Sequence, residues 1–75
     1  MTWERAIVVY PRVRDVFIDG HRVGQTNELL RVRRGQQDFD LGMPADYRPS
    51  TQRVSIANTS AIRPAIIVFE PTSHT

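Results

Sequence analysis

Apolar and polar residues alternate with a period of two along much of this chain, which is the pattern of β-strands with one buried face. In the segment Val13–Ile18, for example, the alternation places Val16 and Ile18 on the face that we expect to be buried. No window repeats apolar residues at the three-and-four spacing of a helix over two turns. The sequence therefore predicts an all-β fold, a small antiparallel β-sandwich of about six or seven short strands.

A β-hairpin is predicted around the dipeptide Asp19-Gly20, which is the strongest short-range hairpin signal. The return strand is short, and Gly24 predicts a further turn at its end. Aspartate accepts hydrogen bonds from turn amides, and glycine adopts positive φ without strain. The residues assigned a structural turn role on these grounds are Asp19, Gly20, Gly24 and Gly35.

A second hairpin is predicted from Leu29–Arg33 and Asp38–Leu41, with the turn at Gly35. Each of the two segments alternates apolar with charged residues, so that one face of each is buried and the other is charged. The charged side chains are then expected to form an ion-pair ladder across the hairpin, with Asp38 and Asp40 opposite Arg31 and Arg33.

The C-terminal half predicts two more strands, Gln52–Ile56 and Ala65–Phe69, separated by polar connections. The last strand nearly repeats the first: Ala65–Pro71 reads AIIVFEP and Ala6–Pro11 reads AIVVYP. Continuous apolar runs are typical of strands buried on both faces, and we expect the two runs to lie side by side in one sheet. The alternative is that one of them is covered only by a second subunit, in a homodimer formed through the terminal strands.

Length and composition predict a single small domain over residues 1–71, followed by a flexible C-terminal tail at residues 72–75. The chain has 75 residues and no cysteine, so disulfides and cysteine-based metal sites are excluded. No apolar stretch is long enough to span a membrane as a helix. If Met1 is the native start, export is not encoded and the location is cytoplasmic.

The charge pattern makes nucleic acid an unlikely partner, although it stays the alternative to a protein partner. All ten basic residues are arginine, and eight acidic residues are interspersed with them, for a formal net charge of +2. The one basic cluster is Arg31, Arg33 and Arg34, which with Tyr47, Phe17 or Tyr10 nearby would form a groove for single-stranded nucleic acid. The same residues are candidate contacts for a protein partner.

Trp3, the sole tryptophan, precedes the first strand, where it either covers the core or is exposed as an anchor for a partner. Packing in the core is the favoured interpretation. His21 lies beside Asp19, but one histidine without further ligands or a base at interpretable spacing predicts neither a metal site nor catalysis. We expect no enzymatic activity and no cofactor.

The segment Val16–Asn27, VFIDGHRVGQTN, resembles the opening hairpin of the PEGA domain family, whose usual form is aromatic, aliphatic, Asp-Gly, two residues, then aliphatic-Gly-x-Thr-Pro. The resemblance continues in the family's order through about Val13–Phe69. It is carried by an aliphatic run into a glycine turn, by the next strand and by the family's Gly-Tyr-x-Pro element: Leu30, Val32, Gly35, Phe39, Leu41, Tyr47, Pro49, Val54 and Ile56.

The sequence departs from the PEGA pattern at three places: the tetrapeptide that names the family is absent, Asn27 replaces a proline, and Asp46 replaces a glycine. The resemblance implies a small β-sandwich module without catalysis, of a kind found in prokaryotic surface and membrane-attached proteins. It therefore predicts a non-enzymatic structural or protein-interaction module, with an unidentified protein or a second copy as the partner.

Overall fold

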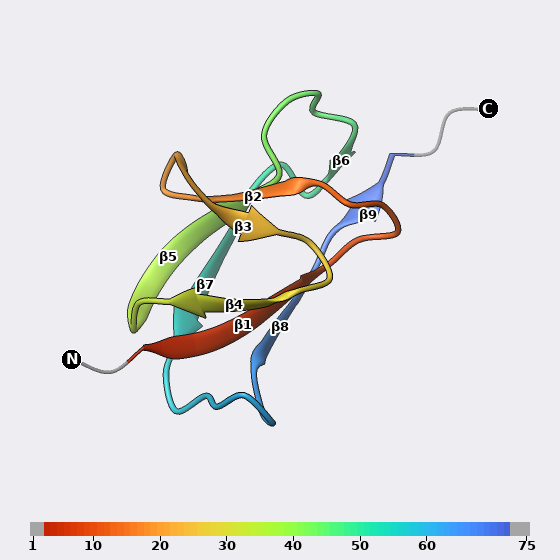
Figure 1. Cartoon of the computed structure of the whole chain (residues 1–75). Coiled ribbons are helices and arrows are strands. Elements are labelled where there is room, and N and C mark those ends of the chain that lie inside the picture. The colour runs from red at the N-terminus through yellow and green to blue at the C-terminus, as the bar shows by residue number, and fades with distance from the viewer. Residues whose placement is uncertain (1–2, 73–75) are drawn as a thin grey trace.

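The computed structural model describes residues 3–72, which form nine strands and no helix (Figure 1). The first sheet has the strand order β4-β1-β8, with β4 at Leu29–Val32, β1 at Glu4–Val9 and β8 at Ala65–Val68. The second has the order β3-β2-β5-β7, with β3 at His21–Gln25, β2 at Asp15–Ile18, β5 at Gly35–Asp40 and β7 at Gln52–Ile56. A ribbon of two short strands, β6 (Tyr47–Arg48) and β9 (Glu70–Pro71), completes the fold.

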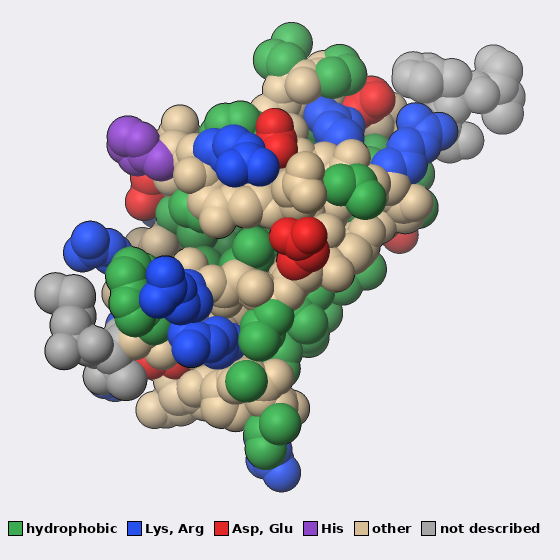
Figure 2. All heavy atoms as spheres, in the orientation of Figure 1, with side chains coloured by type: hydrophobic (Ala, Val, Ile, Leu, Met, Phe, Trp, Pro, Cys, Tyr) green, Lys and Arg blue, Asp and Glu red, His purple; other side chains and the backbone are tan. Residues whose placement is uncertain are grey.

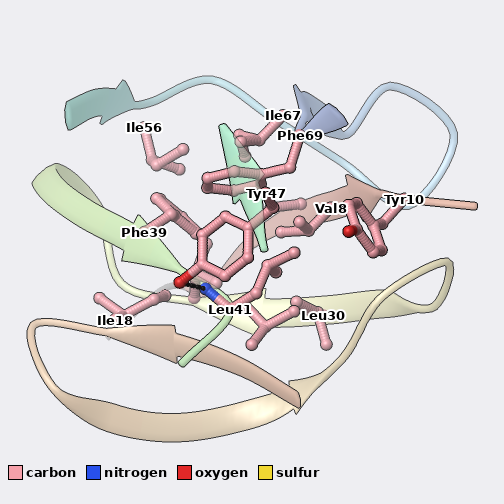
Figure 3. Close-up of a cluster of buried hydrophobic side chains, with 13 residues drawn as sticks. Val8, Tyr10, Ile18, Leu30, Phe39, Leu41, Tyr47, Ile56, Ile67 and Phe69 are labelled. Carbon is pink, nitrogen blue, oxygen red and sulfur yellow. Dashed lines mark hydrogen bonds between the residues drawn. The ribbon is translucent and has the colours of Figure 1, made fainter. Parts of the chain in front are cut away.

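The core lies between the two larger sheets, as the alternation of the sequence predicts (Figure 3). The three-stranded sheet contributes Val8, Leu30 and Ile67, and the four-stranded sheet contributes Phe39 and Ile56. The prediction of a small all-β sandwich is confirmed, and its pairing is antiparallel except between β1 and β8. Among the described residues no helix is long and apolar enough to cross a membrane.

The Asp19-Gly20 hairpin forms as predicted between β2 and β3. Asp19 and Gly20 both have positive φ, 50° and 85°, which is the geometry that a tight turn of right-twisted strands requires. The tip is fastened to β5, because the Asp19 N–H donates to the Asp38 carbonyl at 2.9 Å and the Asp19 carboxylate accepts from the Asp38 N–H at 3.2 Å. Asp19 therefore has the structural role that its sequence position indicates.

The turn predicted at Gly24 is wrong, because β3 continues through this residue to Gln25. The chain turns later, where Asn27 has a φ of 64° and its side chain bonds to the backbone of Tyr10. Gly24 is needed for a different reason: a β-carbon at this position would overlap the side chain of Leu30 in the core. The glycine thus permits close contact between β3 and β4.

The predicted second hairpin is also wrong, since β4 and β5 belong to different sheets. β4 pairs with β1, whereas β5 pairs with β2 and β7. Leu30 and Phe39 enter the core from opposite sides, so the connection between their strands must cross from one sheet to the other. Gly35 begins β5 with a φ of 121°, a backbone conformation that favours glycine at this crossing.

The ion-pair ladder that depended on this hairpin does not form. Asp38 lies opposite Arg53 of β7 and accepts from its Nε at 2.9 Å. Asp40 instead accepts from the N–H of Gly42 at 2.8 Å. Arg31 and Arg33 are thereby left on the other sheet, without the carboxylates that the sequence pattern assigned to them.

The two similar terminal segments lie side by side, as predicted. β1 and β8 pair in parallel, with Ala6 opposite Ala65 and Val9 opposite Val68, so equivalent positions of the two segments are neighbours. The expectation that both faces of these strands are buried is wrong in the single chain. Ala6, Val8 and Ile67 face the core, while Ile66 and Val68 are about half exposed on the outer side.

The predicted C-terminal tail falls mostly on residues 73–75, which lie outside the described residues, as do residues 1 and 2. Its first residue, Thr72, donates its N–H to the Asp46 carbonyl at 2.9 Å. This bond continues the β6–β9 ribbon by one residue, so Thr72 packs with the domain and is not part of a flexible tail.

Candidate interaction surfaces

The outer side of the three-stranded sheet carries five apolar residues, which we call the apolar face: Ile7, Val9, Leu29, Ile66 and Val68. Leu29, Ile7 and Ile66 lie directly beside one another across the three strands. Ile66 is 57% exposed, Val68 51% and Leu29 46%. Figure 2 shows hydrophobic side chains gathered over β1, β4 and β8. A contiguous apolar patch that spans three strands is a candidate contact site for a partner.

The outer side of the four-stranded sheet is mainly polar, although the half-buried Phe17 also lies on it. Two cross-strand ion pairs cover it, Arg22 with Asp15 at 3.0 Å and Arg53 with Asp38 at 2.9 Å. This is the surface expected of a sheet that faces water. The contrast between the two outer sides therefore singles out the three-stranded sheet as the one that is suited to a partner.

Trp3 is exposed at one end of the apolar face, so the prediction that it packs in the core is wrong. Its side chain is 42% exposed. The guanidinium of Arg31 lies over the indole ring at 5.2 Å from the ring centroid, and that of Arg33 lies over it at 5.8 Å. Cation–π contacts of this length stabilise the position of the three side chains. Two of the candidate arginines and Trp3 thus form one cluster.

A pocket of about 400 Å³ opens beside this cluster, between the end of β4 and the tip of the β2–β3 hairpin. Its volume is in the range of small-ligand pockets. Core side chains form its apolar floor and Trp3 and the arginines form its rim; its lining is Trp3, Ile18, Asp19, His21, Val23, Arg31, Val32, Arg33 and Gln37. We call it the Trp3 pocket.

The predicted groove of Arg31, Arg33 and Arg34 with Tyr47 does not form. Tyr47 is buried in the core, where its ring meets Phe69 edge-on at a centroid distance of 5.5 Å. Its hydroxyl accepts from the Leu41 N–H at 3.1 Å and donates to the Gly42 carbonyl at 2.9 Å. Tyr47 is therefore a structural residue and is not available to a partner.

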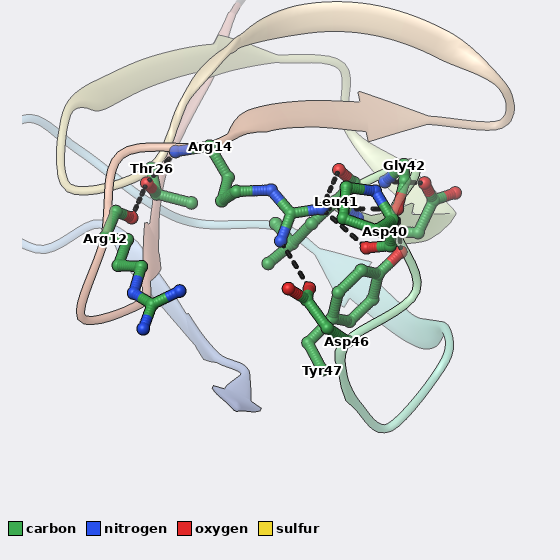
Figure 4. Close-up of polar contacts among 9 residues, drawn as sticks. Arg12, Arg14, Thr26, Asp40, Leu41, Gly42, Asp46 and Tyr47 are labelled. Atoms are coloured by element: carbon green, nitrogen blue, oxygen red, sulfur yellow. Dashed lines mark hydrogen bonds and ion pairs between the residues drawn. The ribbon is translucent and has the colours of Figure 1, made fainter. Parts of the chain in front are cut away.

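Arg14 organises the loop between β5 and β6, a role that the sequence pattern does not indicate (Figure 4). Its guanidinium bonds to the Asp46 carboxylate at 2.6 Å and to the Pro44 carbonyl at 2.8 Å, and it lies over the Tyr47 ring at 5.4 Å. Asp46 is 32 positions away in the chain, so no local spacing could have paired the two residues.

No catalytic or metal-binding arrangement is seen around His21. The side chain is exposed at the hairpin, and the neighbouring Asp19 carboxylate is engaged by the backbone of β5. Within residues 3–72, no three histidine, cysteine, aspartate or glutamate side chains come together in a way that could hold a metal ion. The geometry of this region is that of a hairpin tip at the rim of the Trp3 pocket.

Glu4 fastens the loop that precedes β8 to the first strand. Its carboxylate accepts from the hydroxyl of Thr59 at 2.5 Å and from the Thr59 N–H at 2.8 Å. The Thr59 hydroxyl oxygen in turn accepts from the Arg5 N–H at 2.7 Å. The hydrogen bonds from the Thr59 side chain and backbone lower the pKa of Glu4.

We expect the protein to lose stability as the pH falls below about 4. The pKa of Glu4 is lowered by Thr59 and that of Asp38 by its hydrogen bond from Arg53. A carboxyl with a lowered pKa in the folded state stabilises it above the unfolded pKa, and this contribution is lost as the pH falls through the folded pKa. Thermal unfolding measured between neutral and acidic pH should show a falling Tm, with a weaker dependence in Glu4→Gln; a constant Tm would contradict the assignment.

Comparisons with known proteins found no match to this chain among protein-family models, curated proteins or solved structures.

Proposed function

We propose that this chain is a non-enzymatic protein-interaction module whose docking surface is the apolar face. The observation that carries the proposal is the difference between the two outer sides of the sandwich. One is covered by ion pairs, while the other exposes Ile66, Val68 and Leu29. The resemblance of the Asp19-Gly20 hairpin and the later strands to PEGA domains also supports a module of this kind, since domains of that family are often appended to other domains.

We further propose a second copy of the chain as the occupant of this surface. The strands β1 and β8 are apolar on both sides, and a second sheet placed on the outer side would bury them in the way that such strands are usually buried. A stable interface buries about 800 Å² on each partner, which is about one sixth of the 5145 Å² surface of this chain.

The distribution of charge favours a two-fold arrangement with antiparallel strands. The centre of the apolar face, around Ile7 and Ile66, has no charged residue, whereas Arg5 and Arg31 are paired in register at one end. A two-fold axis brings the same patch of both copies together. With the strands antiparallel, the arginine ends of the two copies lie at opposite ends of the interface and do not repel each other.

Sedimentation equilibrium tests this proposal. The wild-type chain should form a dimer that dissociates on dilution through the micromolar range. The double variant Ile66→Thr/Val68→Thr should be monomeric at the same concentrations, because both side chains contribute to the apolar face and lose apolar area. Both residues are half exposed in the single chain, so the Tm of the monomer should change little.

The matched control is Val13→Thr, which alters an exposed valine outside the apolar face and should leave the dimer intact. A wild-type chain that is monomeric throughout the micromolar range would overturn self-association as the function of this surface. A dimer that persists in the double variant would show that copies associate elsewhere.

A further inference from the structure

The Trp3 pocket combines an apolar floor with a cationic rim. Ile18 and Val32 are buried core residues that close its base, and the partly exposed indole of Trp3 forms one wall. Arg31 and Arg33 stand at the rim, where each lies over the indole. A ligand that fills this space must therefore offer apolar surface to the floor and negative charge to the rim.

The two guanidiniums are available for such a ligand. Within residues 3–72, the side chains of Arg31 and Arg33 take part in no ion pair and no hydrogen bond; their contacts are with the face of the indole. An arginine that stacks on an aromatic ring keeps its N–H donors at the edge of the guanidinium plane. Those donors match the two oxygens of a carboxylate, which arginine binds in a bidentate manner.

The acidic residue at the pocket does not neutralise this rim. The Asp19 carboxylate accepts from the Asp38 N–H at 3.2 Å and stays with the hairpin turn. The amide group of Gln37, another polar side chain of the lining, donates to the carbonyl of Arg33. Both groups are thus committed to the backbone, so the arginines and the exposed His21 are the polar side chains of the lining that are left to meet a ligand.

We propose that the Trp3 pocket binds a peptide segment in which an acidic side chain neighbours a large aliphatic side chain. The aliphatic group would lie on the apolar floor against Trp3, and the carboxylate would pair with Arg31 and Arg33. This inference goes beyond self-association of the apolar face, because the pocket is lined by Trp3 just before β1, the end of β4, the β2–β3 hairpin and Gln37 of β5. It gives the module a second, heterologous partner.

The structure favours an acidic peptide over single-stranded nucleic acid. Two guanidiniums already lie over the ring on which a base would stack. The floor offers no hydrogen-bonding groups to a base. Nucleic-acid grooves also neutralise several phosphates in a row, which a rim with two arginines does not provide.

Fluorescence titration tests the proposal directly, because Trp3 is the only tryptophan in the chain. The probe is the blocked tetrapeptide acetyl-Glu-Leu-Glu-Leu-amide, and its matched control is acetyl-Gln-Leu-Gln-Leu-amide. The acidic peptide should change the Trp3 emission saturably and bind at least about tenfold more tightly than the neutral one. Added salt should weaken its binding, since the rim is exposed to solvent.

Variants measured by calorimetry separate this site from the apolar face. Arg31→Gln/Arg33→Gln should lose the acidic peptide, whereas Arg63→Gln, an exposed arginine remote from the pocket, should bind it normally. Ile66→Thr/Val68→Thr should also bind it normally even though it no longer dimerises, so the two proposals fail independently. Equal binding of both tetrapeptides, no saturable change in emission, or tighter binding of a short oligothymidylate would overturn the proposal.

Discussion

Replacing Phe39 by alanine should lower the free energy of unfolding by about 3–5 kcal/mol, the largest effect that we expect from a single substitution. Phe39 is fully buried in β5, and its ring fills the space between the two sheets (Figure 3). Removing the ring takes apolar contacts from both sheets and leaves a cavity that a thin sandwich can close only in part. For a domain of this size the Tm should fall by roughly 12–25 °C or more.

Urea unfolding followed by circular dichroism measures this loss. Phe39→Leu keeps most of the apolar volume and should cost about 1.5 kcal/mol or less, which makes it the matched control. If alanine and leucine cost the same small amount, Phe39 does not span the core, and the arrangement of the two sheets described above is wrong.

Replacing Gly24 by valine should cost roughly 3 kcal/mol, the second largest effect. A side chain at this position would overlap Leu30, which is itself held between the sheets. β3 would have to move away from β4, or Leu30 would have to leave its place in the core. Thermal unfolding should therefore show a Tm lower by more than about 10 °C.

A substitution at Gly20 separates the effect of backbone strain from that of the close contact between Gly24 and Leu30. A β-carbon at Gly20 meets nothing within 4 Å, although its φ of 85° disfavours other residues. Gly20→Ala should therefore cost only about 1 kcal/mol, from backbone strain at a turn. If Gly24→Val were no more destabilising than Gly20→Ala, the close contact between Gly24 and Leu30 would not exist.

The sequence predicts the individual strands of this fold better than it predicts which strands pair with each other. Alternation correctly indicates that Val16, Ile18 and Phe39 face the core, and Asp19-Gly20 correctly marks a hairpin, because both signals are local. The pairing of β4 with β1 is not local. The segments Leu29–Arg33 and Asp38–Leu41 are close in sequence and well patterned for a hairpin, yet they must line opposite sides of one core.

Only part of the Trp3 pocket can be predicted from the sequence, and the reason is again that its residues meet through long-range strand pairing. The sequence indicates Arg31, Arg33 and Trp3 as candidate contacts, but it does not predict that they meet, since Trp3 reaches β4 only through the β1–β4 pairing. It also predicts Tyr47 beside the arginines in a groove, whereas Tyr47 is a core residue. Residues that meet through long-range pairing leave no spacing signal in the sequence.

The repeat of the terminal segments contains the clearest functional signal. It predicted strands that lie side by side and are covered on both faces; the single chain satisfies the first expectation and leaves the second unmet at Ile66 and Val68. In the proposed dimer, the other copy would supply the cover that the sequence pattern predicts.

Disulfide trapping tests this central claim most directly, because the chain has no cysteine of its own. Ile66→Cys places a single thiol at the centre of the apolar face, and Ser55→Cys places one on the exposed outer side of the four-stranded sheet as the matched control. Under mild oxidation at a concentration where the wild-type chain is dimeric, we expect a linked dimer from Ile66→Cys and almost none from Ser55→Cys. Equal linkage of the two variants, or none of Ile66→Cys, would contradict the account.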